Sequence, residues 1–177
     1  MIHIQRNFFI IYGLIALVIL LRLVPHPVNF TPMGALGLFA GAYLARKSAW
    51  LIPVVALAIS DLFIGTYEPV AMLFVYLGFV SGAFLGHYLL KNRFNGLLLA
   101  GSSVAVSVLF FLLSNFGTWL AGTLYPLTLA GLAQCYILAL PFFGNTLAST
   151  LIYTFVLFTV IELLNHHLGR NRSITAV

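Results

Sequence analysis

The sequence is a succession of long apolar runs, separated by short segments that hold nearly all of its charged residues. A bilayer core about 30 Å thick requires roughly 20 apolar residues in each spanning helix. Hydrophobic residues make up 62% of the 177-residue chain and charged residues only 6%, against about 45–50% and 25% in soluble domains. This composition excludes a soluble enzyme, a disordered tail, a nucleic-acid-binding module and a disulfide-stapled secreted domain. We therefore expect the lipid bilayer to be the solvent of this chain.

The apolar runs predict an all-α membrane protein, a six-transmembrane-helix bundle that forms one domain over residues 1–177. Prolines and basic residues mark most of the ends, because proline disfavours a helix at its own position and at the residue before it. The spans are expected at residues 8–24, 34–45, 50–66, 70–90, 96–120 and 146–164. A short extra helix, 127–140, is expected in the last outer loop because Pro126 and Pro141 bracket it.

The distribution of the basic residues predicts the orientation of this bundle. If the N-terminus is cytoplasmic, one of the 8 Lys and Arg residues, Arg22, falls on the outer side. The others fall on the cytoplasmic side: Arg6, Arg46, Lys47, Lys91, Arg93, Arg170 and Arg172. Cytoplasmic loops carry an excess of Lys and Arg in membrane proteins. We therefore expect both termini to be cytoplasmic, and the basic pI reflects topology rather than a nucleic-acid partner.

Glycines recur at a four-residue spacing in two of the expected spans. Gly78, Gly82 and Gly86 lie in the fourth span, and Gly37 and Gly41 lie in the second. Glycines four apart share one helix face, and they let another backbone approach closely, which drives helix association in lipid. The spacing predicts either packing within this bundle, which we favour, or a docking face for a partner subunit.

Asp61, in the third span, is an acidic residue at membrane depth. Ionisable groups there are expensive and face a cavity, a partner or a pathway. Two interpretations of Asp61 remain open at this stage: an outer helix end at which the carboxylate bonds loop amides, or part of a ligand or ion site. The other two acids, Glu68 and Glu162, fall near the two membrane interfaces. This placement argues against a proton-driven pump.

Uncharged polar and aromatic residues gather in the outer connections. The first connection reads PHPVNFTP, the third contains TYEP, and the fifth is long but almost uncharged. Small molecules are bound in mostly apolar pockets with a few polar groups, although aromatic residues also form belts at membrane interfaces. The predicted substrate-binding residues are His26, Asn29, Phe30, Asp61, Tyr67, Asn115, Trp119, Tyr125, Tyr136 and Asn145.

The sequence contains no motif for catalysis or for a resident cofactor. It has no GxSxG, HExxH, P-loop or GxGxxG pattern, so we expect a protein that is not an enzyme and has no intrinsic cofactor. Cys135 is the one cysteine, which excludes an internal disulfide. A free cysteine in an apolar run usually behaves as a small hydrophobic residue.

Several segments resemble a known group of membrane proteins. The chain contains SDLFIGTY, with the pattern Asp61-Leu62-x-x-Gly65, and also RLVPHPVNFTPMGALGLFAGAYL, NFGTWL and YPLTLAGLAQCYILALPFFGNTL. Together with six short spans, these are similar to the substrate-binding S components of energy-coupling-factor (ECF) vitamin transporters. Over most of residues 20–150 the chain more closely resembles an uncharacterised family of small bacterial membrane proteins that is related to them.

The resemblance implies a multi-pass protein of the bacterial cytoplasmic (inner) membrane, with an outward-facing pocket capped by the first, third and fifth connections. Such proteins bind a vitamin-like solute and deliver it together with a transmembrane coupling protein and two ATPases. Some Gram-negative relatives work without that module and take up cobalamin, with a cysteine as cobalt ligand. By that likeness, Cys135 would be a metal ligand only if the solute is a corrinoid.

Our hypothesis from the sequence is therefore a solute-binding transporter subunit for a small vitamin-like micronutrient, with cobalamin as one candidate. Its other contacts would be the lipid bilayer and, as the resemblance implies, a coupling protein with ATPases. The alternative is a non-catalytic structural or accessory subunit of a larger membrane complex, whose glycine faces pack against partners. A weaker alternative is an enzyme that acts on a lipid or a corrinoid.

Overall fold

The computed structural model describes residues 8–44, 46–93 and 95–174, and this part of the chain is helical with no strand. Three helices are long and apolar enough to cross a membrane, and three shorter apolar helices accompany them. In chain order the elements are α1 (Phe8–Leu23), α2 (Met33–Tyr43), α3 (Arg46–Ala49), α4 (Leu51–Ile64), α5 (Pro69–Leu85), the π-helix η2 (Gly86–Leu90), α6 (Gly96–Leu120) and α7 (Leu129–Ile174).

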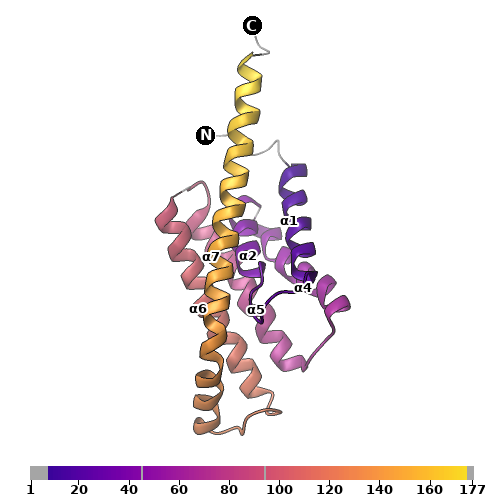
Figure 1. Cartoon of the computed structure of the whole chain (residues 1–177), viewed down its shortest axis with the longest axis vertical. Coiled ribbons are helices and arrows are strands. Elements are labelled where there is room, and N and C mark those ends of the chain that lie inside the picture. Colours follow the sequence, from indigo (N-terminus) through magenta and orange to yellow (C-terminus); the bar gives the residue numbers. More distant parts are fainter. Residues whose placement is uncertain (1–7, 45, 94, 175–177) are drawn as a thin grey trace.

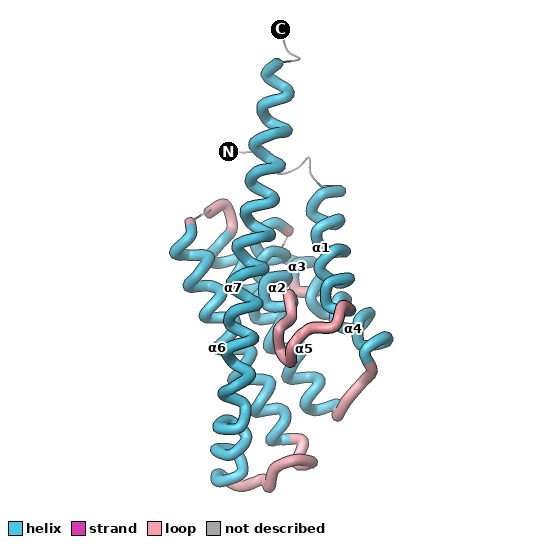
Figure 2. Tube along the Cα trace, in the orientation of Figure 1, coloured by secondary structure: helices cyan, strands magenta, loops and turns pink. Residues whose placement is uncertain are grey.

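The helices form an elongated bundle in which both chain termini lie toward the same end (Figure 1). The connection between η2 and α6 also lies toward that end. The connections 24–32, 65–68 and 121–128 lie away from that end, with 121–128 at the opposite tip, and this part of the bundle is called the far end below. Figure 2 shows the first of these as a long loop across the face of the bundle. The basic residues Lys91 and Arg93 are therefore at the termini end, and Arg22 is toward the far end.

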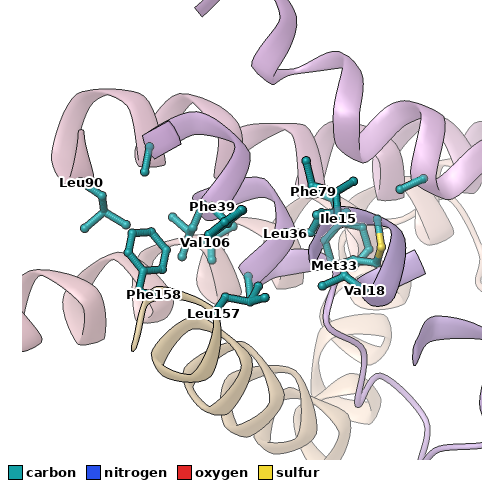
Figure 3. Close-up of a cluster of buried hydrophobic side chains, with 14 of the residues drawn as sticks. Ile15, Val18, Met33, Leu36, Phe39, Phe79, Leu90, Val106, Leu157 and Phe158 are labelled. Atoms are coloured by element: carbon teal, nitrogen blue, oxygen red, sulfur yellow. The ribbon is translucent and has the colours of Figure 1, made fainter. Parts of the chain in front are cut away.

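The short helix α2 is the centre of the bundle. Ten of its residues, Met33 to Ala42, are buried, and it packs against α1, α4, α5, α6 and α7. Figure 3 shows Leu36 and Phe39 of α2 among side chains from its neighbours, including Phe79, Val106 and Phe158. At about 1.5 Å per residue, its 11 residues extend only roughly 16 Å. This helix is thus a core element and is too short to cross a bilayer core alone.

Glycines allow α2 and the α5–η2 helix to approach each other at backbone contact. A Cβ atom on Gly37 would lie 2.7 Å from the carbonyl oxygen of Phe79, and one on Gly41 would overlap the carbonyl oxygen of Ala83. In the opposite direction, a Cβ on Gly86 would overlap the carbonyl oxygen of Leu38. The prediction that the four-residue glycine spacing serves packing within the bundle is confirmed for this pair of helices.

Helix α7 differs from the prediction. The sequence predicted a loop helix, 127–140, separate from a last span, 146–164, but the structure has one helix of 46 residues that continues through Pro141. Proline is tolerated in membrane helices because an unpaired backbone group there can be satisfied by neighbours, and irregular backbone exposed to lipid is not tolerated at all. The prediction of a long fifth connection is therefore wrong. Only residues 121–128 join α6 to α7.

Buried hydroxyl groups line the part of α7 that faces the core. Thr146, Ser149, Thr150 and Thr154 are each at most 3% exposed. The Thr146 hydroxyl donates to the Phe142 carbonyl at 3.3 Å, and that of Ser149 donates to Thr146 at 3.0 Å. Small and hydroxyl-bearing side chains let membrane helices pack closely. These bonds satisfy the hydroxyls of Thr146 and Ser149, whereas Oγ1 of Thr154 is buried without a hydrogen-bond partner among the described residues.

Candidate functional site

The far end of the bundle contains a buried ion pair between α1 and α4. Nη2 of Arg22 lies 2.8 Å from Oδ1 of Asp61, and the two side chains are 13% and 3% exposed. Nη1 of Arg22 also donates to the Ser60 hydroxyl and, at 3.5 Å, to the Leu57 carbonyl. A charged group away from water is tolerated when it is paired and its hydrogen bonds are satisfied. Arg22 therefore provides the buried carboxylate of Asp61 with a charged partner.

A third helix joins this ion pair. The phenol of Tyr76, on α5, donates to Oδ2 of Asp61 at 2.8 Å. Both carboxylate oxygens of Asp61 thus have a partner, one on α1 and one on α5. The Ser60 hydroxyl, which accepts from Arg22, itself donates to the Ala56 carbonyl at 2.6 Å within α4. Arg22, Ser60, Asp61 and Tyr76, called the far-end ion-pair cluster below, tie α1, α4 and α5 together.

Sequence reasoning identified Asp61 and missed Arg22 and Tyr76. Two interpretations were open for Asp61, and the structure does not show the one in which its carboxylate bonds loop amides, because both oxygens have side-chain partners. The other, a part of a ligand or ion site, stays a prediction. A signal for Arg22 was present, because it is the one cation that departs from the positive-inside pattern. A lone cation and a lone acid near the same end of two neighbouring helices are expected to pair.

Tyr67 lies in the connection between α4 and α5, six residues after Asp61 in the chain. Its side chain is 43% exposed. Burial of the phenol, with the negative charge of Asp61 as a second cause, raises the pKa of Tyr67 to about 12, although the charge of Arg22 acts in the opposite direction. Tyr67 therefore remains a protonated hydrogen-bond donor at neutral pH.

The other two acidic residues have structural partners elsewhere. Oε2 of Glu68 accepts a hydrogen bond from the Ala71 amide at 2.7 Å, and this caps the first turn of α5. Oε1 of Glu162, on α7, accepts from the phenol of Tyr43 at 3.3 Å. A side-chain acceptor at the N-cap satisfies an amide that the helix itself leaves unpaired. The ion pair of Asp61 with Arg22 distinguishes it from both glutamates.

The first connection is tied to α7 by two contacts. Nδ2 of Asn145 donates to the Val28 carbonyl at 2.9 Å, and the rings of Phe30 and Tyr153 meet edge to face with centroids 6.1 Å apart. Asn29 has a φ of 62°, in the left-handed region that asparagine adopts more readily than most residues. His26 places Nδ1 3.0 Å from the Pro27 carbonyl oxygen. Asn145, one of the predicted substrate-binding residues, therefore contacts the first connection from within helix α7.

Replacing Asn145 by alanine is expected to release the first connection without unfolding the bundle. The change removes one neutral hydrogen bond, which contributes about 1 kcal/mol, and leaves the Val28 carbonyl to solvent. We expect faster proteolysis and faster amide exchange in residues 24–32, with other segments unchanged. Asn115→Ala is the matched control, because Nδ2 of Asn115 donates to the Phe111 carbonyl of its own helix. Equal exchange rates in both variants would contradict the tether.

A second set of predicted residues lies where α6 meets the start of α7. Sγ of Cys135 donates to the Asn115 carbonyl at 3.4 Å, and the phenol of Tyr136 donates to the Leu112 carbonyl at 2.7 Å. The indole of Trp119 donates to the Pro126 carbonyl at 3.0 Å, next to Tyr125 in the 121–128 connection. These polar groups are occupied by backbone carbonyls. They hold the two helices together and are not joined by these bonds to the far-end ion-pair cluster.

A comparison with protein-family models places the chain. The chain belongs to the Family of unknown function DUF6580. The family model matches residues 2–173, which is nearly the whole sequence. No curated protein and no solved structure matches the chain. The far-end ion-pair cluster, the tether of the first connection and the glycine contacts of α2 therefore describe a DUF6580 protein directly, without inference from a relative.

The described part of this DUF6580 chain holds no group of three or more His, Cys, Asp or Glu side chains that could bind a metal ion. Cys135, on α7, is 1% exposed and contacts α6. To bind a metal ion, Sγ of Cys135 would have to leave the Asn115 carbonyl and become accessible. The conditional prediction of Cys135 as a cobalt ligand stays a prediction, and the observed packing favours its structural role.

Proposed function

We propose that this DUF6580 protein is a multi-pass protein of the bacterial inner membrane. The helices α1, α2, α4, α5, α6 and α7 would form six membrane segments, three of which are long enough to span by themselves. Both termini would be cytoplasmic, and the far end would face outward. Lys91 and Arg93 at the termini end support this orientation, because basic residues concentrate in cytoplasmic segments. Arg22 no longer opposes it, since its charge is paired with Asp61.

We further propose that the protein is a membrane transporter subunit, similar to an S component, that binds a small vitamin-like micronutrient at the far end for uptake. The observation that supports this best is the ion pair of Arg22 and Asp61 within an apolar bundle. Intramembrane ionisable residues are costly and mark substrate or ion pathways. In this proposal the pair and Tyr67 hold the polar part of the solute, and Phe30 with other far-end aromatic residues contacts its apolar part.

A coupling partner is part of this proposal. Helix α1 has an exposed face that includes Tyr12, Leu17 and Leu20. Gly13 lies on the same face, where an added Cβ would meet no atom within 4 Å. Small residues at an exposed position of a membrane helix allow close approach of another helix. This face supports contact with a transmembrane coupling protein and its ATPases, as the likeness to S components implies.

Native mass spectrometry of the protein purified from its membrane tests the proposed function. We expect a co-purified small molecule on the wild-type protein, and loss of that mass from an Arg22→Gln/Asp61→Asn double variant that stays folded. Lys91→Gln is the matched control, because Lys91 is an exposed cation at the other end of the molecule. A stoichiometric protein partner without any small molecule would instead support the accessory-subunit alternative.

The cobalamin hypothesis gives a separate prediction for Cys135. Because Sγ is buried against the Asn115 carbonyl, we expect a Cys135→Ala variant to retain any corrinoid affinity and absorbance spectrum of the wild type. We also expect the wild-type thiol to react with N-ethylmaleimide at least about tenfold more slowly than an unfolded control. A corrinoid spectrum that changes in Cys135→Ala would show cobalt ligation by the thiolate and contradict this expectation.

A further inference from the structure

We infer that the accessible side of the far-end ion-pair cluster binds an oxyanion, a carboxylate or phosphate group, through Arg22 and Tyr67. The inference rests on the proposed function only in taking this oxyanion as part of the transported solute. It names the chemical class of that solute, which neither the family nor the likeness to S components provides.

The side chains of Arg22 and Asp61 differ in their exposure to solvent. The Arg22 side chain is 13% exposed and that of Asp61 only 3%. The carboxylate is the less exposed partner, and its second oxygen accepts a hydrogen bond from the phenol of Tyr76. A ligand that approaches the pair therefore reaches the arginine side chain more readily than the carboxylate.

The guanidinium of Arg22 has more hydrogen-bond donors than its partners in the cluster use. A guanidinium has five N–H donors in a planar fork and no acceptor. In the described part of the chain, Nη1 of Arg22 donates to Ser60 and Leu57, and Nη2 donates to Asp61. Among the described residues, these bonds leave two of the five N–H donors of Arg22 without a partner, Nε–H and one N–H of Nη2. Guanidinium N–H groups form strong charge-assisted hydrogen bonds with carboxylate and phosphate groups.

The phenol of Tyr67 is the second donor of the proposed site. Tyr67 is 43% exposed and stays protonated at neutral pH, so its hydroxyl can donate a hydrogen bond to the same ligand. Both groups can donate and Arg22 carries a positive charge, while the acceptor oxygens of Asp61 are occupied. A cationic amine would be repelled by the charge of Arg22. An oxyanion satisfies both donors.

A lipid headgroup could supply the same chemistry as a free solute, because phospholipids also carry a phosphate. The experiment must therefore separate the two sources. Benzoate is a suitable probe, with benzylammonium as a match of similar shape and opposite charge and benzyl alcohol as a neutral match. Each is titrated against the full-length protein, once in delipidated dodecyl maltoside micelles and once in phosphatidylcholine nanodiscs, with saturation-transfer NMR as the measure of binding.

We expect benzoate to bind at least about tenfold more tightly than benzylammonium or benzyl alcohol in both environments, because charge-assisted hydrogen bonds are the strong ones. Tyr67→Phe, which removes one hydroxyl at an exposed position, is expected to weaken benzoate about fivefold. Tyr88→Phe, at an exposed tyrosine in η2, is the matched control and should leave the affinity unchanged. Arg22→Gln/Asp61→Asn should abolish the preference for benzoate.

Equal or stronger binding of benzylammonium would overturn the inference, and so would the absence of benzoate binding in both environments. Benzoate binding in micelles that phosphatidylcholine abolishes would overturn the solute assignment and give the site to a lipid phosphate. These outcomes are distinct from failure of the proposed function. A protein that binds benzoate through Arg22 but co-purifies with no small molecule would retain the oxyanion site and lose the transport proposal.

Discussion

Gly41→Ala is expected to destabilise the protein more than almost any other change of one methyl group. The added Cβ would overlap the carbonyl oxygen of Ala83 and lie 2.7 Å from the backbone nitrogen of His87. Both obstacles are backbone atoms of the α5–η2 helix, so no side-chain rotation relieves the clash. Overpacking of this kind typically costs about 1–3 kcal/mol, and we expect about 3 kcal/mol here. Thermal melting in detergent should show a Tm lower by roughly 6–12 °C.

Gly101→Ala is the matched control for this prediction. Gly101 is also a helical glycine, in α6, but a Cβ there would meet no atom within 4 Å. Alanine is favoured over glycine in a helix interior by about 0.5–1 kcal/mol, so its Tm should stay equal to that of the wild type or rise slightly. If Gly41→Ala melts within 2 °C of Gly101→Ala, the protein does not have the close backbone contact between α2 and the α5–η2 helix.

The apolar runs predicted the helices well because one physical rule governs them. In lipid the backbone must bond to itself, so an apolar run of sufficient length becomes a helix whatever its detailed sequence. The expected span 96–120 coincides with α6, and the other spans differ from the helices by a few residues at their ends, apart from the last. That exception is α7. The prediction ended a helix at Pro141 because proline disfavours a helix. The helix continues through Pro141 because irregular backbone exposed to lipid is not tolerated.

The candidate site was only partly predictable, because its partners come from different helices. Asp61 is conspicuous as an acid within an apolar run, and Asn145 was among the predicted substrate-binding residues. Arg22 and Tyr76 become its partners only once α1, α4 and α5 are packed side by side. The sequence contains no periodic signal for such a pairing. Polar groups such as those of Cys135 and Tyr136 are likewise satisfied by carbonyls of another helix, which composition does not reveal.

Breaking the ion pair by one substitution is expected to be severe, and removing both charges is expected to restore much of the stability. In Arg22→Gln the carboxylate of Asp61, 3% exposed, loses its charged partner. In Asp61→Asn the guanidinium is the group left without one. An uncompensated buried charge costs about 3–5 kcal/mol, whereas replacement of a whole buried pair is often nearly neutral. The double variant Arg22→Gln/Asp61→Asn should therefore be more stable than either single variant.

A double-mutant cycle on Tm and on the free energy of unfolding in detergent measures this coupling, and we expect at least about 2 kcal/mol between the two positions. Lys91→Gln removes an exposed cation at the termini end and should change Tm by less than about 2 °C. Additive single effects would show that Arg22 and Asp61 do not depend on each other. A double variant about as stable as the wild type would show that folding does not require the two charges, which is what the proposed binding site at the far end predicts.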